Sequence, residues 1–105
     1  MIHWPVIIIC EQGANYAWAD GPEQLAEQGL WRGDRLIDSQ GGTHILSQQN
    51  DDTLYWHRQP ELVSLAELNI ELKLYAASLG VCCTAKLVTR TLADAMALVA
   101  WLELQ

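Results

Sequence analysis

The chain has 105 residues, half of them apolar, and a formal net charge of −7 from 13 acidic and 6 basic residues. This length and apolar content predict one domain over residues 1–105 with an ordinary core, and they argue against a disordered tail. The negative charge argues against a nucleic-acid backbone or an anionic membrane as partner. Because the acids are scattered, we interpret them as a solvated surface that keeps the domain soluble.

The first apolar run, residues 4–10, contains three consecutive isoleucines and ends at Cys10. Nearly continuous, β-branched apolarity predicts a central strand covered on both faces, with Pro5 at its first residues because proline cannot donate to a ladder. A lipoprotein signal is disfavoured, since no Lys or Arg precedes the run and Ile9 stands where a small residue is needed. No other stretch has the apolar length of a membrane span, so we expect a cytoplasmic protein.

The next segment predicts a hairpin and a short helix. Residues 15–19 read as the returning strand, with Tyr16 and Trp18 on one face and alanines on the other. The Asp-Gly-Pro-Glu sequence at residues 20–23 predicts a helix to about residue 28, because proline suits the first helical turn and glutamate favours the N-terminal half. Gly29 is expected to end that helix.

A second hairpin is predicted where residues 35–38 and 43–47 bracket the Ser-Gln-Gly-Gly sequence at residues 39–42. This composition supplies the positive φ angles and side-chain-to-backbone bonds of a tight turn. The aromatic content of residues 53–57 predicts a further strand, which we place at an edge of the sheet.

The strongest local signals lie in residues 64–79, which we expect the rest of the chain to pack around. Ser64 and Glu67 have the spacing of a capping box, and Gly80 supplies a left-handed stop. The alternation of apolar and polar residues within 68–74 also suits a strand, but the Leu, Glu, Lys and Ala content favours a helix. Its apolar residues form two stripes, Leu65, Leu68, Leu72, Tyr75 and Leu79 in the first and Ile70, Leu74 and Ala77 in the second.

The C-terminal part predicts a strand over residues 81–88 and a final helix to about Leu104. Thr91 and Asp94 repeat the capping pattern at the start of that helix. Trp101 lies on the apolar arc of the helix, and we expect it in the core.

These elements follow the order β-β-α-β-β-β-α-β-α, without an internal repeat, and the hairpins exclude a purely parallel sheet. The predicted fold is therefore α+β, with a single mainly antiparallel sheet and two or three helices packed chiefly on one face.

Asp38, Ser39 and His44 supply one residue of each type found in a catalytic triad. No Gly-x-Ser-x-Gly elbow accompanies them, and Asp38-Ser39-Gln40-Gly41 is ordinary turn chemistry, so we assign no catalytic residue. Gly41-Gly42 also lacks the continuation of a phosphate-binding loop.

Metal-site spacing is absent from the histidines and cysteines, so we expect no metal and no cofactor. The three cysteines, Cys10, Cys82 and Cys83, are an odd number without framework spacing. We interpret them as reduced, buried thiols.

The chain has five tryptophans and no phenylalanine. Some of these rings must fill the core, yet tryptophan is also enriched at binding surfaces because it combines a large apolar area with one polar group. The candidate partner-binding residues are Tyr16, Trp18, Tyr55 and Trp56.

Four segments together resemble a family of small gammaproteobacterial proteins of unknown function and about this length. They are Trp4-Pro5 with the isoleucine run, Asp34-Arg35-Leu36-Ile37-Asp38-Ser39-x-Gly41, Ser64-Leu65-x-Glu67 and Cys83-x-x-Lys86. The resemblance spans most of the chain and implies a stand-alone bacterial cytosolic domain. It transfers no catalytic residue.

Two functions remain open from the sequence. The first is a non-enzymatic interaction module that meets a protein partner or a second copy of itself through an aromatic patch. The second is a small enzyme or ligand binder that uses a polar cluster of Asp34, Arg35, Asp38 and His44. An exposed aromatic surface would favour the first function, and a deep pocket with perturbed carboxylates would favour the second.

Overall fold

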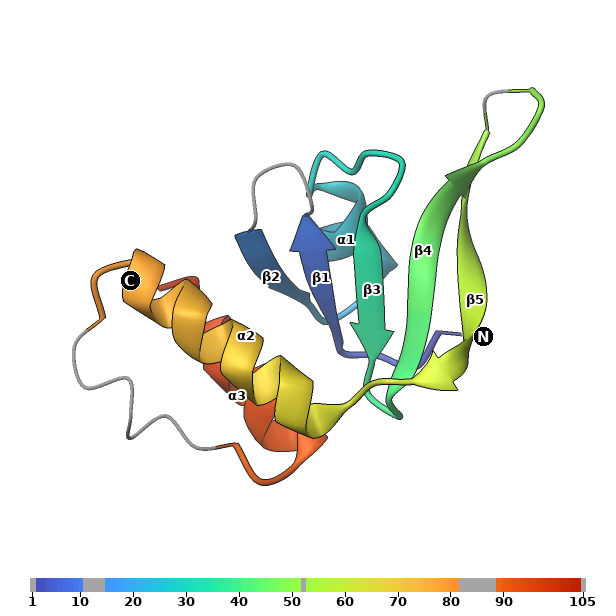
Figure 1. Ribbon diagram of the computed structural model, residues 1–105. Coiled ribbons are helices and arrows are strands. Elements are labelled where there is room, and N and C mark those ends of the chain that lie inside the picture. Colours follow the sequence, from blue (N-terminus) through green and yellow to red (C-terminus); the bar gives the residue numbers. More distant parts are fainter. Residues whose placement is uncertain (1, 11–14, 52, 82–88, 105) are drawn as a thin grey trace.

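A computed structural model describes residues 2–10, 15–51, 53–81 and 89–104. Within these ranges the chain forms one five-stranded sheet in which all neighbouring strands are antiparallel. The strands are β1 (Val6–Cys10), β2 (Asn15–Ala19), β3 (Arg35–Asp38), β4 (Gly42–Gln48) and β5 (Leu54–Leu62). Their spatial order is β2-β1-β3-β4-β5, so β1 lies inside the sheet and β5 lies at an edge, as predicted (Figure 1).

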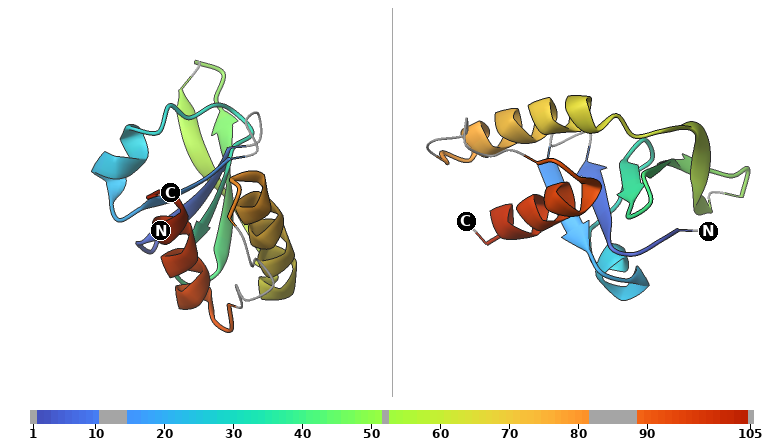
Figure 2. Two further views of the ribbon diagram at one scale, coloured as in Figure 1. Left: turned by 90° about the vertical axis from the view of Figure 1, so that its left-hand side faces the viewer. Right: turned by 90° about the horizontal axis from the view of Figure 1, so that it is seen from below.

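The described helices are α1 (Pro22–Ala26), α2 (Leu65–Ser78) and α3 (Leu92–Leu102). The two long helices, α2 and α3, pack together over one face of the sheet, and the short helix α1 lies on the other face (Figure 2). The predicted α+β class, with helices chiefly on one face, is confirmed.

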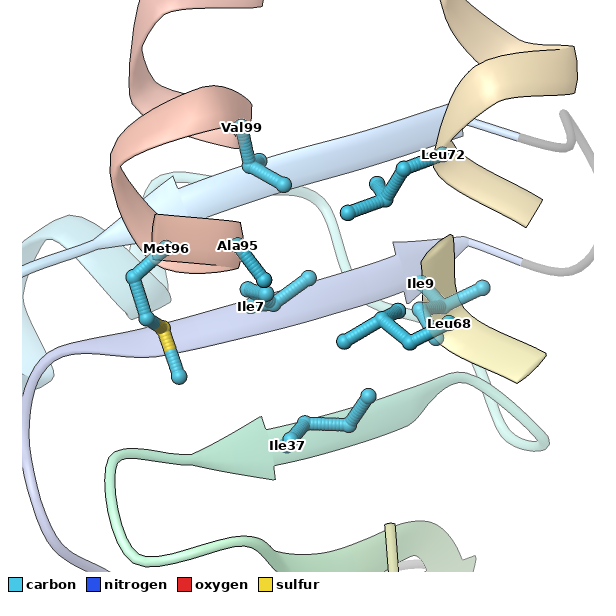
Figure 3. Packing of buried hydrophobic residues seen from close by; sticks show 8 residues of the cluster. All are labelled: Ile7, Ile9, Ile37, Leu68, Leu72, Ala95, Met96 and Val99. Carbon is cyan, nitrogen blue, oxygen red and sulfur yellow. The ribbon is translucent and has the colours of Figure 1, made fainter. Parts of the chain in front are cut away.

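The core is divided by the alternation of β1. Ile7 and Ile9 point toward α2 and α3, whereas Val6 and Ile8 join the apolar cluster on the α1 side. Figure 3 shows the helix-side cluster, in which side chains of the two long helices pack against side chains of the sheet. The helices contribute Leu68, Leu72, Ala95, Met96 and Val99, and the sheet contributes Ile7, Ile9 and Ile37. Because both faces of β1 are buried, its sequence is almost continuously apolar.

Both long helices begin at the predicted caps. The Ser64 hydroxyl accepts the Glu67 N–H at 3.3 Å. At the start of α3, Thr91 Oγ1 accepts the Asp94 N–H, and Asp94 Oδ2 accepts the Thr91 N–H. These side chains satisfy backbone donors that the first turn of a helix leaves unpaired.

Ser64→Ala is expected to lower the free energy of unfolding by about 1 kcal/mol, within a usual spread of about 0.5–2, because it removes the acceptor for the Glu67 N–H. Urea denaturation measures this loss. Ser64→Asp is the matched control, since aspartate keeps an acceptor at the cap and should restore most of the stability. An unchanged midpoint in Ser64→Ala would show that the cap does not stabilise α2.

Several element boundaries differ from the prediction. β5 extends through Pro60 to Leu62, whereas the sequence predicted a strand over 53–57, because a shift in register beside Gly42 accommodates proline. α1 ends at Ala26 and α3 at Leu102, each before the predicted end. Most of the strand predicted over 81–88 lies outside the described residues.

One expectation about burial is wrong, and of the two stripes predicted in α2 the second is exposed. Trp101 is 44% exposed rather than part of the core, because α3 turns Ala95, Val99 and Leu102 inward and leaves Trp101 on its flank. In α2, Leu68, Leu72 and Ala76 are buried while Ile70 and Leu74 of the second stripe are exposed. A helix in this layer has neighbours on one side only, so one stripe is buried.

Candidate functional site

Two polar side chains are buried together at the end of the second hairpin. Asp38, the last residue of β3, is 0% exposed and His44 in β4 is 3% exposed. The distance from His44 Nε2 to Asp38 Oδ2 is 3.3 Å. Asp38 Oδ1 accepts the backbone N–H groups of Gln40 at 3.0 Å and Gly42 at 2.9 Å. The carboxylate therefore organises the turn between β3 and β4.

The surroundings of Asp38 keep it ionised. Burial raises the pKa of this carboxyl group, but hydrogen bonds from Gly42, Gln40, His44 and the His3 backbone together have the larger, opposite effect. The net result is a pKa below the ordinary value for aspartate. A carboxylate in this state accepts hydrogen bonds at neutral pH and has no proton to donate, so it suits a structural role.

Gly42 leaves space that a larger residue would fill. A Cβ atom on Gly42 would lie 2.9 Å from Asp38 Oδ2 and 2.9 Å from Arg58 Cζ. The Arg58 guanidinium group on β5 therefore lies beside the buried carboxylate. Arg58 was not among the residues predicted from the sequence, although the alternation of β5 places it on the same face as Trp56, and the register pairs it with His44.

Of the predicted polar cluster, the structure brings together Asp38 and His44. Asp34 is buried beyond the other end of β3, where its Oδ2 accepts the Trp31 N–H at 3.0 Å. Arg35 pairs with Ile9 and therefore faces α2, whereas Asp38 faces the α1 side. The four side chains do not converge on one point.

Tyr16 and Trp18 lie on β2 against the helices. Both side chains are half-buried at the margin of the helix-side cluster. The Tyr16 hydroxyl donates to Glu71 Oε2 at 3.1 Å, and its ring centroid lies 4.9 Å from that of Tyr75. The binding role of Tyr16 and Trp18 stays a prediction.

Two outward backbone groups at the β2 edge of the sheet are bonded to side chains from α2 and from the residue that caps the C-terminus of α3. Glu103 Oε1 accepts the Trp18 N–H at 2.8 Å, and the Tyr75 hydroxyl donates to the Tyr16 carbonyl at 3.4 Å. These contacts satisfy backbone groups that an edge strand would otherwise present to solvent.

The β5 edge differs, because its outward backbone groups are open. The Gln49 N–H donates to the Thr53 carbonyl at 2.8 Å, which identifies this pair as the hydrogen-bonded type. Pair types alternate along an antiparallel ladder, so Tyr55 and His57 bond to β4. The N–H and C=O groups of Leu54, Trp56 and Arg58 therefore point away from the sheet, and within the described ranges no side chain caps them.

The remaining candidate residues, Tyr55 and Trp56, lie on this open strand. Tyr55 is 38% exposed, and its ring meets that of His57 edge to face at 6.1 Å. Trp56 points to the opposite face, where it is half-buried against the α1-side cluster. The two rings do not form one patch, but both flank the same backbone edge.

A hollow of about 270 Å³ lies between α2 and the face of the β3, β4 and β5 strands. Its lining combines apolar side chains such as Ile37 and Leu68 with the charged residues Arg35, Glu67 and Glu71. Small-ligand pockets usually have volumes of roughly 300–1,000 Å³, so the volume of this hollow is slightly below that range.

Cys10 is a free, half-buried cysteine at the end of β1. Burial raises the pKa of its thiol, and the nearby Asp34 carboxylate raises it further. Cys82 and Cys83 lie outside the described residues. No group of three His, Cys, Asp or Glu side chains is placed to hold a metal ion in the part of the chain that the structure describes.

Cys10 is expected to react with a disulfide reagent at neutral pH at least about tenfold more slowly than an exposed thiol, because the thiolate is the reactive form. The measurement uses Cys82→Ser/Cys83→Ser, which leaves Cys10 as the sole thiol, and the same chain unfolded in guanidinium as control. Equal rates in the folded and unfolded chains would contradict the expectation.

The described helices include none long and apolar enough to cross a membrane. The described residues form an α+β fold in which side chains cap two backbone groups at the β2 edge of the sheet and none caps the outward groups of Leu54, Trp56 and Arg58 at the β5 edge. The chain belongs to the family DUF4144, described as a protein structure with unknown function, whose family model matches residues 4–99. No curated protein and no solved structure matches the chain.

Proposed function

We propose that this chain is a non-enzymatic protein-interaction module that binds an extended polypeptide along the open edge of β5. The observation that carries the proposal is the contrast between the two edges. On β2 the Trp18 N–H and the Tyr16 carbonyl are capped by side chains, whereas no described residue caps the outward groups of β5 from Leu54 to Arg58.

The spacing of the outward backbone groups on β5 indicates the kind of partner that this edge binds. Outward N–H and C=O groups recur at every second residue of β5, about 6.7 Å apart, and a polypeptide in extended conformation matches that spacing. Beyond Arg58, the shift in register and Pro60 interrupt the ladder, which protects the rest of the strand from such pairing. The binding segment is therefore Leu54 to Arg58.

The side chains of this segment add anchors on both faces. Tyr55 and His57 stand on the α2 side, and Trp56 with Arg58 stands on the α1 side. Aromatic residues and arginine are the types that contribute most to binding energy in protein interfaces. Tyr16 and Trp18 stay secondary candidates, for which Trp18→Ala with sedimentation is the direct test.

The proposal places the module in the cytoplasm of a bacterium. It is supported by the cysteine content, which lacks the spacing of a disulfide framework, and by the resemblance carried by the sequence motifs.

A second candidate function is small-ligand binding in the hollow beneath α2. The observation that favours it is the combination of Arg35 with Glu67 and Glu71 around an apolar lining. A ligand there should shift the amide signals of Glu67 and Glu71 rather than those of β5.

Peptides selected from a random library against the immobilised chain test the proposal. We expect them to shift the backbone amide NMR signals of Leu54, Trp56 and Arg58. Arg58→Pro removes an outward N–H that makes no bond to β4, and it should weaken peptide binding at least about tenfold. Arg58→Thr loses the same side chain but keeps the N–H, so it is the matched control and should bind the selected peptides at least about tenfold more tightly than Arg58→Pro. Selected peptides that bind Arg58→Pro and Arg58→Thr equally would contradict the proposal.

A further inference from the structure

We infer that the strand bound at β5 is β5 of a second copy of this chain, paired antiparallel about a two-fold axis at Trp56. The inference rests on the proposed function, because it names the partner for the same open edge. It draws on the positions of the outward backbone groups and on the side chains that pairing would place opposite one another.

Symmetry limits the registers that two copies can adopt. When a two-fold axis stands perpendicular to the sheet, directly opposed residues lie on the same face of it. One residue must therefore face its own counterpart in the second copy, and that residue defines the register. With the axis at Trp56, Leu54 faces Arg58 of the second copy, and Trp56 faces Trp56. Every outward residue then meets an outward residue, so all their N–H and C=O groups are matched.

Other registers leave part of this edge unmatched. With the axis at Arg58, the two arginines face each other and Trp56 faces Pro60, which has no N–H. With the axis at Leu54, Arg58 faces Asn50 in the turn that connects β4 and β5. With the axis at Tyr55 or His57, two of the three outward residues of one copy face outward residues of this segment in the other copy, and the third does not.

The side chains of the Trp56 register are compatible across the interface. Tyr55 would face His57 of the second copy on the α2 side, a pairing of two aromatic rings. Arg58 would face Leu54, and the segment from Leu54 to Arg58 contains no acidic residue, so no pair of like charges lies opposite. This local composition suits self-pairing despite the net charge of −7.

The open edge is also accessible to a second copy. β5 lies at the margin of the sheet opposite β2, and its Leu54 end extends away from α2 and α3 (Figure 1). Leu54, Tyr55, His57 and Arg58 are all exposed along the segment.

Sedimentation equilibrium of the full chain tests the pairing. The natural chain should show a concentration-dependent dimer. Arg58→Pro should have a dimer dissociation constant at least about tenfold higher than that of Arg58→Thr, because both variants lose the same side chain but only Arg58→Pro loses an intermolecular N–H donor in each copy. A dimer equally strong in Arg58→Pro and Arg58→Thr would overturn the inference.

The register has its own test in a background of Cys10→Ser, Cys82→Ser and Cys83→Ser. Directly opposed residues of a hydrogen-bonded pair have Cα atoms about 5.5 Å apart, within the range of a disulfide. Trp56→Cys should therefore oxidise to a covalent dimer. Arg58→Cys, whose counterpart would be displaced along the strand, should not. Crosslinking of Arg58→Cys in preference to Trp56→Cys would overturn the register. This crosslinking test does not depend on whether a proline variant folds.

The outcomes separate this inference from the proposed function. A natural chain that stays monomeric while selected peptides still shift the Leu54, Trp56 and Arg58 amides would overturn self-pairing and leave strand addition intact. A monomer whose β5 binds no selected peptide would overturn both.

Discussion

Asp38→Ala is expected to lower the free energy of unfolding by about 3–5 kcal/mol, because removing one partner of a buried, hydrogen-bonded pair leaves the others unsatisfied. The groups left without their acceptor are the N–H groups of Gln40 and Gly42 and the His44 ring. Urea denaturation measures the loss.

The matched control for Asp38→Ala is Asp51→Ala. Asp51 also accepts a backbone N–H in a turn, from Thr53 at 3.1 Å, but it is exposed to solvent. Water replaces the carboxylate there, so Asp51→Ala should change stability far less. Equal losses in the two variants would show that burial does not amplify the role of Asp38.

The same carboxylate predicts a direction for acid denaturation. The folded pKa of Asp38 lies below the unfolded value of about 3.9, so its contribution is full above that pH. The contribution is lost as the pH falls from the unfolded pKa through the folded one. Urea midpoints measured between pH 2 and pH 7 should therefore fall less steeply with acid in Asp38→Asn. An acid limb as steep as that of the natural chain would contradict this expectation.

Leu72→Ala is expected to cost about 2–5 kcal/mol, because it leaves a cavity between α2, α3 and the sheet. Leu72 is 0% exposed and belongs to the cluster in Figure 3. Leu74→Ala makes the same chemical change in the same helix at a side chain that is 68% exposed, and it should alter stability by about 0.5 kcal/mol or less. Similar losses in both variants would contradict the assignment of the buried stripe.

Local signals predicted the elements that depend on local chemistry. The caps at Ser64 and Thr91 fixed the starts of α2 and α3, and the polar and glycine residues between β3 and β4 fixed a hairpin. The apolar run before Cys10 predicted a strand buried on both faces. Each of these depends on residues within a few positions of one another.

Features that depend on distant contacts were not predictable in the same way. Trp101 lies on an apolar arc, but its exposure follows from where α3 meets its neighbours. Glu103 caps the Trp18 N–H across 85 positions in the sequence, and no local pattern indicates that pairing. The sequence did allow the prediction that Arg35 and Asp38 lie on opposite faces of the sheet, because odd and even positions of a strand face opposite sides.

Amide hydrogen exchange at dilute concentration tests the open edge of β5 most directly. The N–H groups of Tyr55 and His57, which bond to β4, should exchange slowly, and those of Leu54, Trp56 and Arg58 should exchange rapidly. On concentrating the chain, the three rapid amides should become protected. The opposite alternation at dilute concentration, or equal protection at all five positions, would show that the edge is not open and would contradict the account.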